Sequence, residues 1–231
     1  MDQLLSRRRI LAAGLTLPLL ALPGCATTLG DLGGVGFENA IRRLLTLSSQ
    51  RAFNSLLTQE GFFQDDLSRV TLPPQLGGSG VTRALAVLLG TGAVQERLLR
   101  IVNRAAVQGA EAAAPVIYDS IRDMTITDAL AIARGGPTAA TDYLAGSIGD
   151  RIFDVMFPQV GSALSALENG TIQRVLGVAT GIDFSGLQAD VARKASAGIW
   201  RAVGREEAAI RANPQSTGDP VLTGMFGLLR R

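Results

Sequence analysis

After residue 36, apolar residues recur along the chain at intervals of three and four, the spacing that places them on one face of an α-helix. The first such stretch runs from Phe37 to Leu57, about five turns at ~3.6 residues per turn. Five later helical stretches are expected, and a short one among them lies between Thr125 and Gly135-Gly136. The other four lie over residues 93–113, from Pro115 to Ile121, from Pro137 to Phe157-Pro158 and from Asp183 to Asn213. The pattern predicts an all-α protein with a single multi-helix, bundle-like domain over residues 37–231.

Glycine and proline mark the breaks between these helices. Residues 61–80 contain Pro73-Pro74 and the run Gly77–Gly80, and they are expected to cross the surface between helices. No Gly-Lys-Ser/Thr follows these glycines and no strand precedes them, so a phosphate-binding loop is not indicated. The segment Thr125–Asp128 fits a variant capping box for a helix that ends near Gly135-Gly136.

The N-terminal pattern is that of an export signal. Three arginines, Arg7 to Arg9, precede an apolar run from Ile10 to Leu22 that would span about 20 Å as a helix, short of a hydrocarbon core of roughly 30 Å. The sequence Leu22–Cys25 resembles a bacterial lipobox, although Pro23 departs from the usual small residue. We expect residues 1–24 to be a signal peptide, Cys25 to carry lipid, and residues 25–36 to tether it flexibly to the domain.

The export route and the target membrane are less sharply defined. Residues 6–11, with Arg7 and Arg8, resemble the twin-arginine motif, but they also suit the basic region of an ordinary secretory signal. Ala26 is not the aspartate that retains bacterial lipoproteins at the inner membrane. The resemblance therefore favours a periplasmic protein anchored through Cys25 to the inner face of the outer membrane.

Composition removes several classes of function. Loss of residues 1–24 takes away three arginines and one aspartate, which leaves 19 basic and 19 acidic side chains and little support for nucleic-acid binding. The chain has no histidine, and Cys25 is its only cysteine. Catalysis by imidazole, zinc sites of the usual Cys/His kind and histidine-held haem are therefore excluded, and we expect no metal and no cofactor.

The helix over residues 183–213 carries two adjacent carboxylates at its C-terminal end. At 100° per residue, Glu206 falls within the apolar stripe, whereas Glu207 is expected to pair with Arg211 on the surface. We expect a polar cluster that ties this helix to the one over residues 93–113. If a cleft opens onto the cluster, the cluster becomes a candidate binding site. On this prediction, replacing Glu206 costs more stability than replacing Glu207. The candidate residues are Asn103, Arg104, Glu111, Glu206 and Arg211.

Segments from most of the expected domain, residues 44–227, resemble one family in their order along the chain. They are Gly61-Phe62, Leu72-Pro73, Asn103–Ala106, Glu111 with Pro115, Met124-Thr125 with Asp128-Ala129, Gly135-Gly136, Ala139–Tyr143, Phe157–Val160 and Glu206–Pro214. These segments are similar to those of the DUF4197 family, a proteobacterial set of helical, often lipid-anchored or secreted proteins without an assigned function. Two segments depart from that pattern. The family usually has a long aromatic-bearing helix where this chain has residues 166–172, and it typically has Leu-Phe where this chain has Ile199-Trp200.

Three classes of function follow from these features. The favoured one is a non-enzymatic envelope scaffold or adaptor that presents a helical surface to another protein. The alternative is a carrier of an apolar ligand or lipid in a cleft between helices. A carboxylate-based hydrolase is the third and least favoured, because no nucleophile with a base and an orienting group is recognisable; Lys194 and Ser196, two residues apart on a helix, point away from each other.

Overall fold

Seven α-helices and one short 3-10 helix make up the described part of the chain, and no strand occurs there. The structure is a computed structural model that describes residues 34–72, 91–166 and 183–229. The all-α prediction is confirmed. The elements are α1 (Gly34–Leu56), α2 (Gly61–Gln64), α4 (Gly92–Asp123), α5 (Ala129–Arg134), α6 (Ala139–Ala166), α8 (Phe184–Ala212), the 3-10 helix η3 (Pro214–Thr217) and α9 (Pro220–Leu229).

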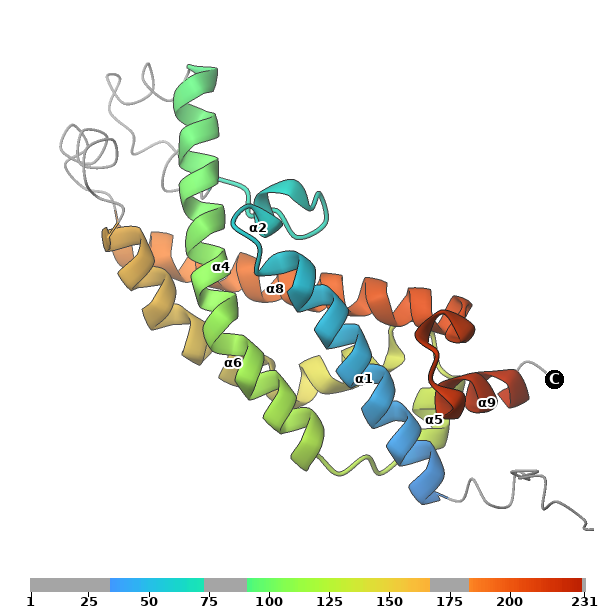
Figure 1. Cartoon of the computed structure of the whole chain (residues 1–231). Helices are drawn as coiled ribbons and strands as arrows, with labels where there is room; N and C mark the ends of the chain where they lie inside the picture. The colour runs from blue at the N-terminus through green and yellow to red at the C-terminus, as the bar shows by residue number, and fades with distance from the viewer. Residues whose placement is uncertain (1–33, 73–90, 167–182, 230–231) are drawn as a thin grey trace, which may run out of the picture.

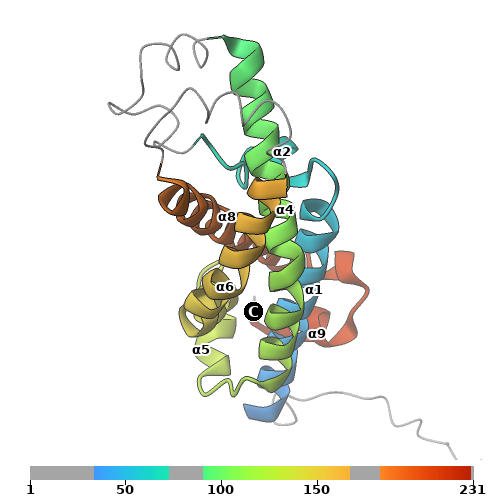
Figure 2. The ribbon, with the colours of Figure 1, turned by 90° about the vertical axis from the view of Figure 1, so that its left-hand side faces the viewer.

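Four long helices form the body of the protein. Helix α4 packs along α6, and α8 lies across the other three, in contact with α1, α4 and α6 (Figure 1). Near its N-terminus, α1 contacts the C-terminal end of α4, because Arg42 of α1 donates to the carbonyls of Ile121 and Met124 at 2.6 and 3.0 Å. Figure 2 shows that the N-terminal turns of α4 extend beyond the layer formed by α1 and α6.

Small residues allow these helices to approach closely. The core faces of α4 and α8 are rich in buried alanine, which lets their backbones lie near the neighbouring helices. At Gly109 of α4, a Cβ atom would lie 2.9 Å from Cγ2 of Val160 on α6. At Gly198 of α8, a Cβ would lie 2.8 Å from the carbonyl oxygen of Ser68, so α8 and the segment after α2 meet only because this position has no side chain.

Several helix boundaries differ from the sequence prediction. Helix α4 continues through Pro115, and α6 continues through Pro158 to Ala166, although both prolines were expected at a helix boundary. Both are exposed, so water can bind the carbonyl that loses its intrahelical partner. Helix α1 begins at Gly34, which makes the last three residues of the expected tether helical. Helix α5 is capped by Asp128, whose side chain accepts from the Ala131 amide at 3.3 Å, rather than by Thr125 as a capping box requires.

Several predicted features lie outside the described residues. They are the signal peptide over residues 1–24 with Arg7 and Arg8, the lipidation site Cys25, and the glycine run at residues 77–80 of the expected surface crossing. The departing segment 166–172 is described only at Ala166. Among the helices of the described ranges, none combines the length and the apolar character needed to cross a membrane.

Candidate functional site

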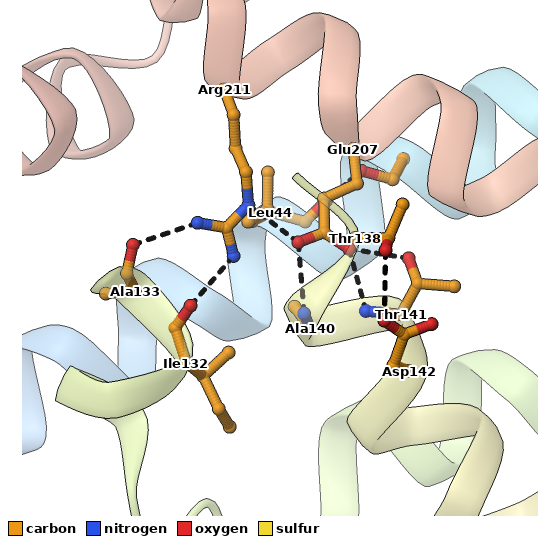
Figure 3. Close-up of polar contacts among 10 residues, drawn as sticks. Leu44, Ile132, Ala133, Thr138, Ala140, Thr141, Asp142, Glu207 and Arg211 are labelled. Carbon is orange, nitrogen blue, oxygen red and sulfur yellow. Dashed lines mark hydrogen bonds and ion pairs between the residues drawn. The ribbon is translucent and has the colours of Figure 1, made fainter. Parts of the chain in front are cut away.

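The buried acidic residue of the C-terminal helix is Glu207. Its side chain is completely inaccessible, whereas that of Glu206 is 25% exposed and meets only Arg205, at 3.7 Å. Both carboxylate oxygens of Glu207 accept hydrogen bonds from the first turn of α6: the amides of Ala140 and Thr141 donate at 3.0 and 2.7 Å, and the Thr141 hydroxyl at 2.6 Å (Figure 3). Glu207 thus caps the N-terminus of α6 from another helix.

Arg211 balances the Glu207 charge and caps a second helix. Its Nε donates to Glu207 at 2.7 Å, and its two terminal nitrogens donate to the carbonyls of Ala133 and Ile132 at 2.9 and 3.0 Å, at the C-terminal end of α5. The guanidinium also lies 5.2 Å from the centre of the Phe226 ring on α9. One ion pair therefore ties α8 to three other helices. It complements the dipoles of α5 and α6, whose contacts with the pair are drawn in Figure 3.

The prediction that Glu206 is the buried carboxylate is wrong, as is the prediction that the Glu207–Arg211 pair lies on the surface. The apolar stripe itself is confirmed, since all of its predicted members are buried: Leu187, Val191, Ala195, Ile199, Ala202, Val203 and Ile210. The error arises because the first turn of α6 packs against Gly204 and Glu207, beside the stripe, and this contact widens the buried face of α8. On that side, the amides of Ala140 and Thr141 donate to the Glu207 carboxylate. The angular position of Glu207 around its helix does not reveal these donors.

The five-residue cluster does not assemble. Asn103 is buried, and its amide group pairs with the backbone of Val70, accepting from the Val70 amide at 2.8 Å and donating to the Val70 carbonyl at 2.9 Å. Arg104 and Glu111 are exposed on α4. Asn103 therefore fixes the segment after α2 to α4, while Arg211 serves a separate site at α5 and α6.

A groove lies next to the buried pair of Glu207 and Arg211. It has a volume of about 430 Å³ and runs between α8, the first turn of α6 and the segment after α2. Most of its lining is apolar. The lining residues are Leu67, Thr138, Thr141, Asp142, Trp200, Arg201, Gly204, Arg205 and Ala208. Below we call this opening the Trp200 groove.

Charged side chains hold the wall of the Trp200 groove in place. Arg205 pairs with Asp65 at 2.7 and 2.9 Å, and Arg201 donates through Nε to the Leu67 carbonyl at 2.5 Å. The hydrogen bond from Arg205 lowers the pKa of Asp65 below its ordinary value, against the opposing effect of burial. These contacts leave Leu67 52% exposed at the mouth of the groove.

This groove was not predicted from the sequence. Trp200 stood out there only as a departure from a family pattern, and residues 61–80 were expected to cross the surface between helices. The groove exists because Leu67 lies beside Trp200, which is 133 positions further along the chain. These two residues are brought together by the tertiary contacts that Asp65, Leu67 and Ser68 make with α8. The signal available in the sequence was a tryptophan followed directly by an arginine; in the structure Trp200 is partly buried.

A second groove, of about 670 Å³, lies between α1 and the start of α9. Its charged residues are engaged in helix ends: Arg42 caps α4, and Arg43 pairs at 2.8 Å with Asp219, which in turn accepts from the Val221 amide at the start of α9. This groove therefore carries the contacts that join α9 to α1.

The described residues offer little for metal binding or nucleophilic chemistry. Within the described ranges, no three or more His, Cys, Asp or Glu side chains gather as a metal site would require. Lys194 pairs with Asp190 at 2.8 Å, one turn away on α8. The Trp200 groove is thus a place where an apolar surface and charged groups meet in the open, and unlike the groove at α1 it does not carry the contacts that join α9 to α1.

Comparison with protein families gives one match, and comparison with curated proteins and with solved structures gives none. The matching model is described as a protein of unknown function, DUF4197, and it covers residues 32–227 of the 231-residue chain. This range contains Asn103, Trp200, Glu207 and Arg211, and hence both the buried ion pair and the groove. The chain belongs to the DUF4197 family.

Proposed function

We propose that this chain is a lipid-anchored, non-enzymatic adaptor of the bacterial envelope, which binds a partner protein through the Trp200 groove. The observation that carries the proposal is the composition of that groove. Trp200, Arg201 and Arg205 lie beside Leu67, one of two large hydrophobic side chains that are exposed in the described ranges. Tryptophan and arginine are enriched among the residues that dominate the energy of protein interfaces, and they act best around an apolar pocket.

The buried carboxylate argues for a binding protein over a hydrolase. Glu207 is the most enclosed acid of the described chain, but its oxygens already accept four hydrogen bonds and have no exposed surface. A general acid or base needs to reach the proton that it transfers. The bonding of Glu207 therefore supports a role in holding helices together.

The anchor belongs to the same proposal. If Cys25 carries lipid, residues 26–33 separate it from the first described residue of α1, and eight residues extend over at most about 29 Å. The domain would then stay close to the periplasmic face of the membrane that holds the lipid, which we take to be the outer membrane. A partner that is held at the same membrane face would meet the groove at a high effective concentration.

Photo-crosslinking in intact cells tests the adaptor. A photoreactive amino acid replaces Leu67 at the groove, or Leu130, the other exposed leucine, on α5. We expect a discrete protein adduct from position 67, none from position 130, and loss of the adduct when Trp200→Ala is added. Equal adducts at both positions, or an adduct that is insensitive to Trp200→Ala, would contradict the proposal.

A second candidate function is transport or storage of an apolar ligand. It is favoured by one observation: the Trp200 groove is mostly apolar, and its volume of about 430 Å³ falls in the range of small-molecule sites. Mass spectrometry of lipids that co-purify with the chain tests it. A defined lipid that is lost with Trp200→Ala would replace the adaptor by a carrier.

A further inference from the structure

The charged side chains around the Trp200 groove differ in how well the protein itself balances their charges. Arg205 is neutralised by Asp65, with two contacts below 3 Å. Asp142 lies in the first turn of α6, where the helix dipole favours a negative charge, and it also accepts from the Thr138 hydroxyl at 2.9 Å. Arg201 remains, and none of the described carboxylates forms an ion pair with it. The groove therefore has one cation whose charge is not matched.

Arg201 is also held in a fixed position. Its Nε donates to the Leu67 carbonyl at 2.5 Å, across the mouth of the groove, and this bond restricts the side chain while leaving the two terminal nitrogens available. A guanidinium presents its donors in a planar fork that fits a carboxylate. Because the side chain is already ordered, a bound anion loses less affinity to the cost of ordering it.

From this geometry we infer that the groove takes an acidic-apolar segment of the partner protein. An aspartate or glutamate of that segment pairs with Arg201, and a neighbouring bulky apolar side chain packs against Trp200 and Leu67. The inference rests on the proposed function, since it specifies the chemistry of the partner in the same groove. Leu67 is 52% exposed, which suits a protein surface laid over the groove better than a fatty acid, because small-molecule sites enclose most of their ligand.

Trp200 makes the inference directly measurable. It is the single tryptophan of the chain, so its fluorescence reports on the groove without labelling. The experiment uses the full chain in nanodiscs of zwitterionic lipid and three peptides that lack tryptophan and tyrosine. Their central residues are Asp-Leu-Phe, Asn-Leu-Phe and Asp-Ser-Ser, each flanked by Gly-Ser linkers. Laurate serves as the lipid probe, with empty nanodiscs as the blank.

We expect the Asp-Leu-Phe peptide to bind about tenfold more tightly than the Asn-Leu-Phe peptide, as loss of one charge-assisted contact predicts. It should also bind more tightly than the Asp-Ser-Ser peptide, which lacks the apolar side chains that pack against Trp200 and Leu67. Arg201→Gln should abolish the preference for Asp over Asn. The matched control is Arg193→Gln, an exposed arginine two turns earlier on α8, which should leave the preference unchanged. Arg201→Lys, which keeps the charge, should retain part of it, and unchanged helical circular dichroism shows that the variants fold.

Three outcomes would overturn the inference. They are equal affinity for the Asp and Asn peptides, equal effects of Arg201→Gln and Arg193→Gln, and tight binding of laurate without any binding of peptide. The first two leave the crosslink from position 67 intact, so the adaptor would stand while its acidic partner falls. The third, together with absence of that crosslink, would instead support the carrier.

Discussion

The buried pair of Glu207 and Arg211 yields the sharpest quantitative prediction. In Glu207→Gln, one amide oxygen can still accept from Ala140 and Arg211, but the new NH2 group faces the Thr141 amide, which is itself a donor. A buried N–H that loses its partner costs about 1–3 kcal/mol. Breaking a buried ion pair by removing one partner costs roughly 3–5 kcal/mol, because the other charge stays buried.

These two costs overlap, since both follow from loss of the same carboxylate, and Arg211 keeps its bonds to the carbonyls of α5. We therefore expect Glu207→Gln to lower the free energy of unfolding by about 3–5 kcal/mol. Glu206→Gln is the matched control: its carboxylate is 25% exposed and meets Arg205 at only 3.7 Å, so its effect should stay below ~0.5 kcal/mol.

Urea denaturation followed by circular dichroism at the helical minimum measures both variants, with the slope of the transition checking that two-state behaviour is kept. A double-mutant cycle with Arg211→Gln should give a coupling of about 1–3 kcal/mol between the two side chains. Equal effects of Glu206→Gln and Glu207→Gln would refute the reasoning, as would a loss below ~1 kcal/mol for Glu207→Gln.

Four further predictions follow from single residues. Asn103→Ala leaves the buried N–H and C=O of Val70 without their partner and should cost about 2–4 kcal/mol in denaturant unfolding, whereas Arg104→Ala, its exposed neighbour, should cost less than ~0.5 kcal/mol. The pKa of Asp65 is lowered in the folded state, so its pairing with Arg205 stabilises the fold fully above the unfolded pKa of about 3.9. The difference in unfolding free energy between the unmodified chain and Asp65→Asn should therefore vanish as the pH falls through the folded pKa. A difference that is constant down to pH ~2 would contradict this. Ser49→Ala removes a buried hydroxyl without a hydrogen-bond partner and should raise the free energy of unfolding by about 1 kcal/mol, while Ser48→Ala, which loses a 2.8 Å bond to the Leu44 carbonyl, should show no gain. Cys25→Ala should move the protein from the membrane to the soluble fraction of the periplasm, and an unchanged distribution would reject lipid anchoring.

The sequence predicted the long helices α1 and α8 well because their signal is local, but it divided α4 at Pro115 and did not predict α2 or α9. The apolar stripe of α8 and its start at Asp183 follow from residues within one helix, and the side chain of Asp183 caps that helix by accepting from Gly186. Prolines 115 and 158 misled the prediction because the local cost of a proline in a helix can be outweighed by tertiary packing. Buried residues lie on both sides of each proline, and the sequence does not show this packing.

The candidate site was predicted only in part, for a related reason. Pairing of Glu207 with Arg211 is local, at i and i+4, and it is present. Burial of Glu207 is not local, because it depends on donors from Ala140 and Thr141 that are more than sixty residues away. The same holds for Asn103, which was expected to meet α8 and instead binds Val70 of the segment after α2. A polar residue on an apolar face predicts that a partner exists without identifying it.

Helix capping by distant side chains links the buried pair to the Trp200 groove. Glu207 binds the amide and the hydroxyl of Thr141. Thr141 is also part of the groove wall, together with Asp142 of the same turn of α6 and Thr138, which directly precedes that helix. Arg201 and Arg205, which form the opposite rim, lie six and two residues before Glu207 on the same helix. The position of the two rims relative to each other is therefore set by one carboxylate that does not itself face the groove. Substitutions at Glu207 should weaken both folding and binding, whereas Arg201 can change the preference for a ligand while the fold is kept, and this separation lets the adaptor proposal be tested apart from stability.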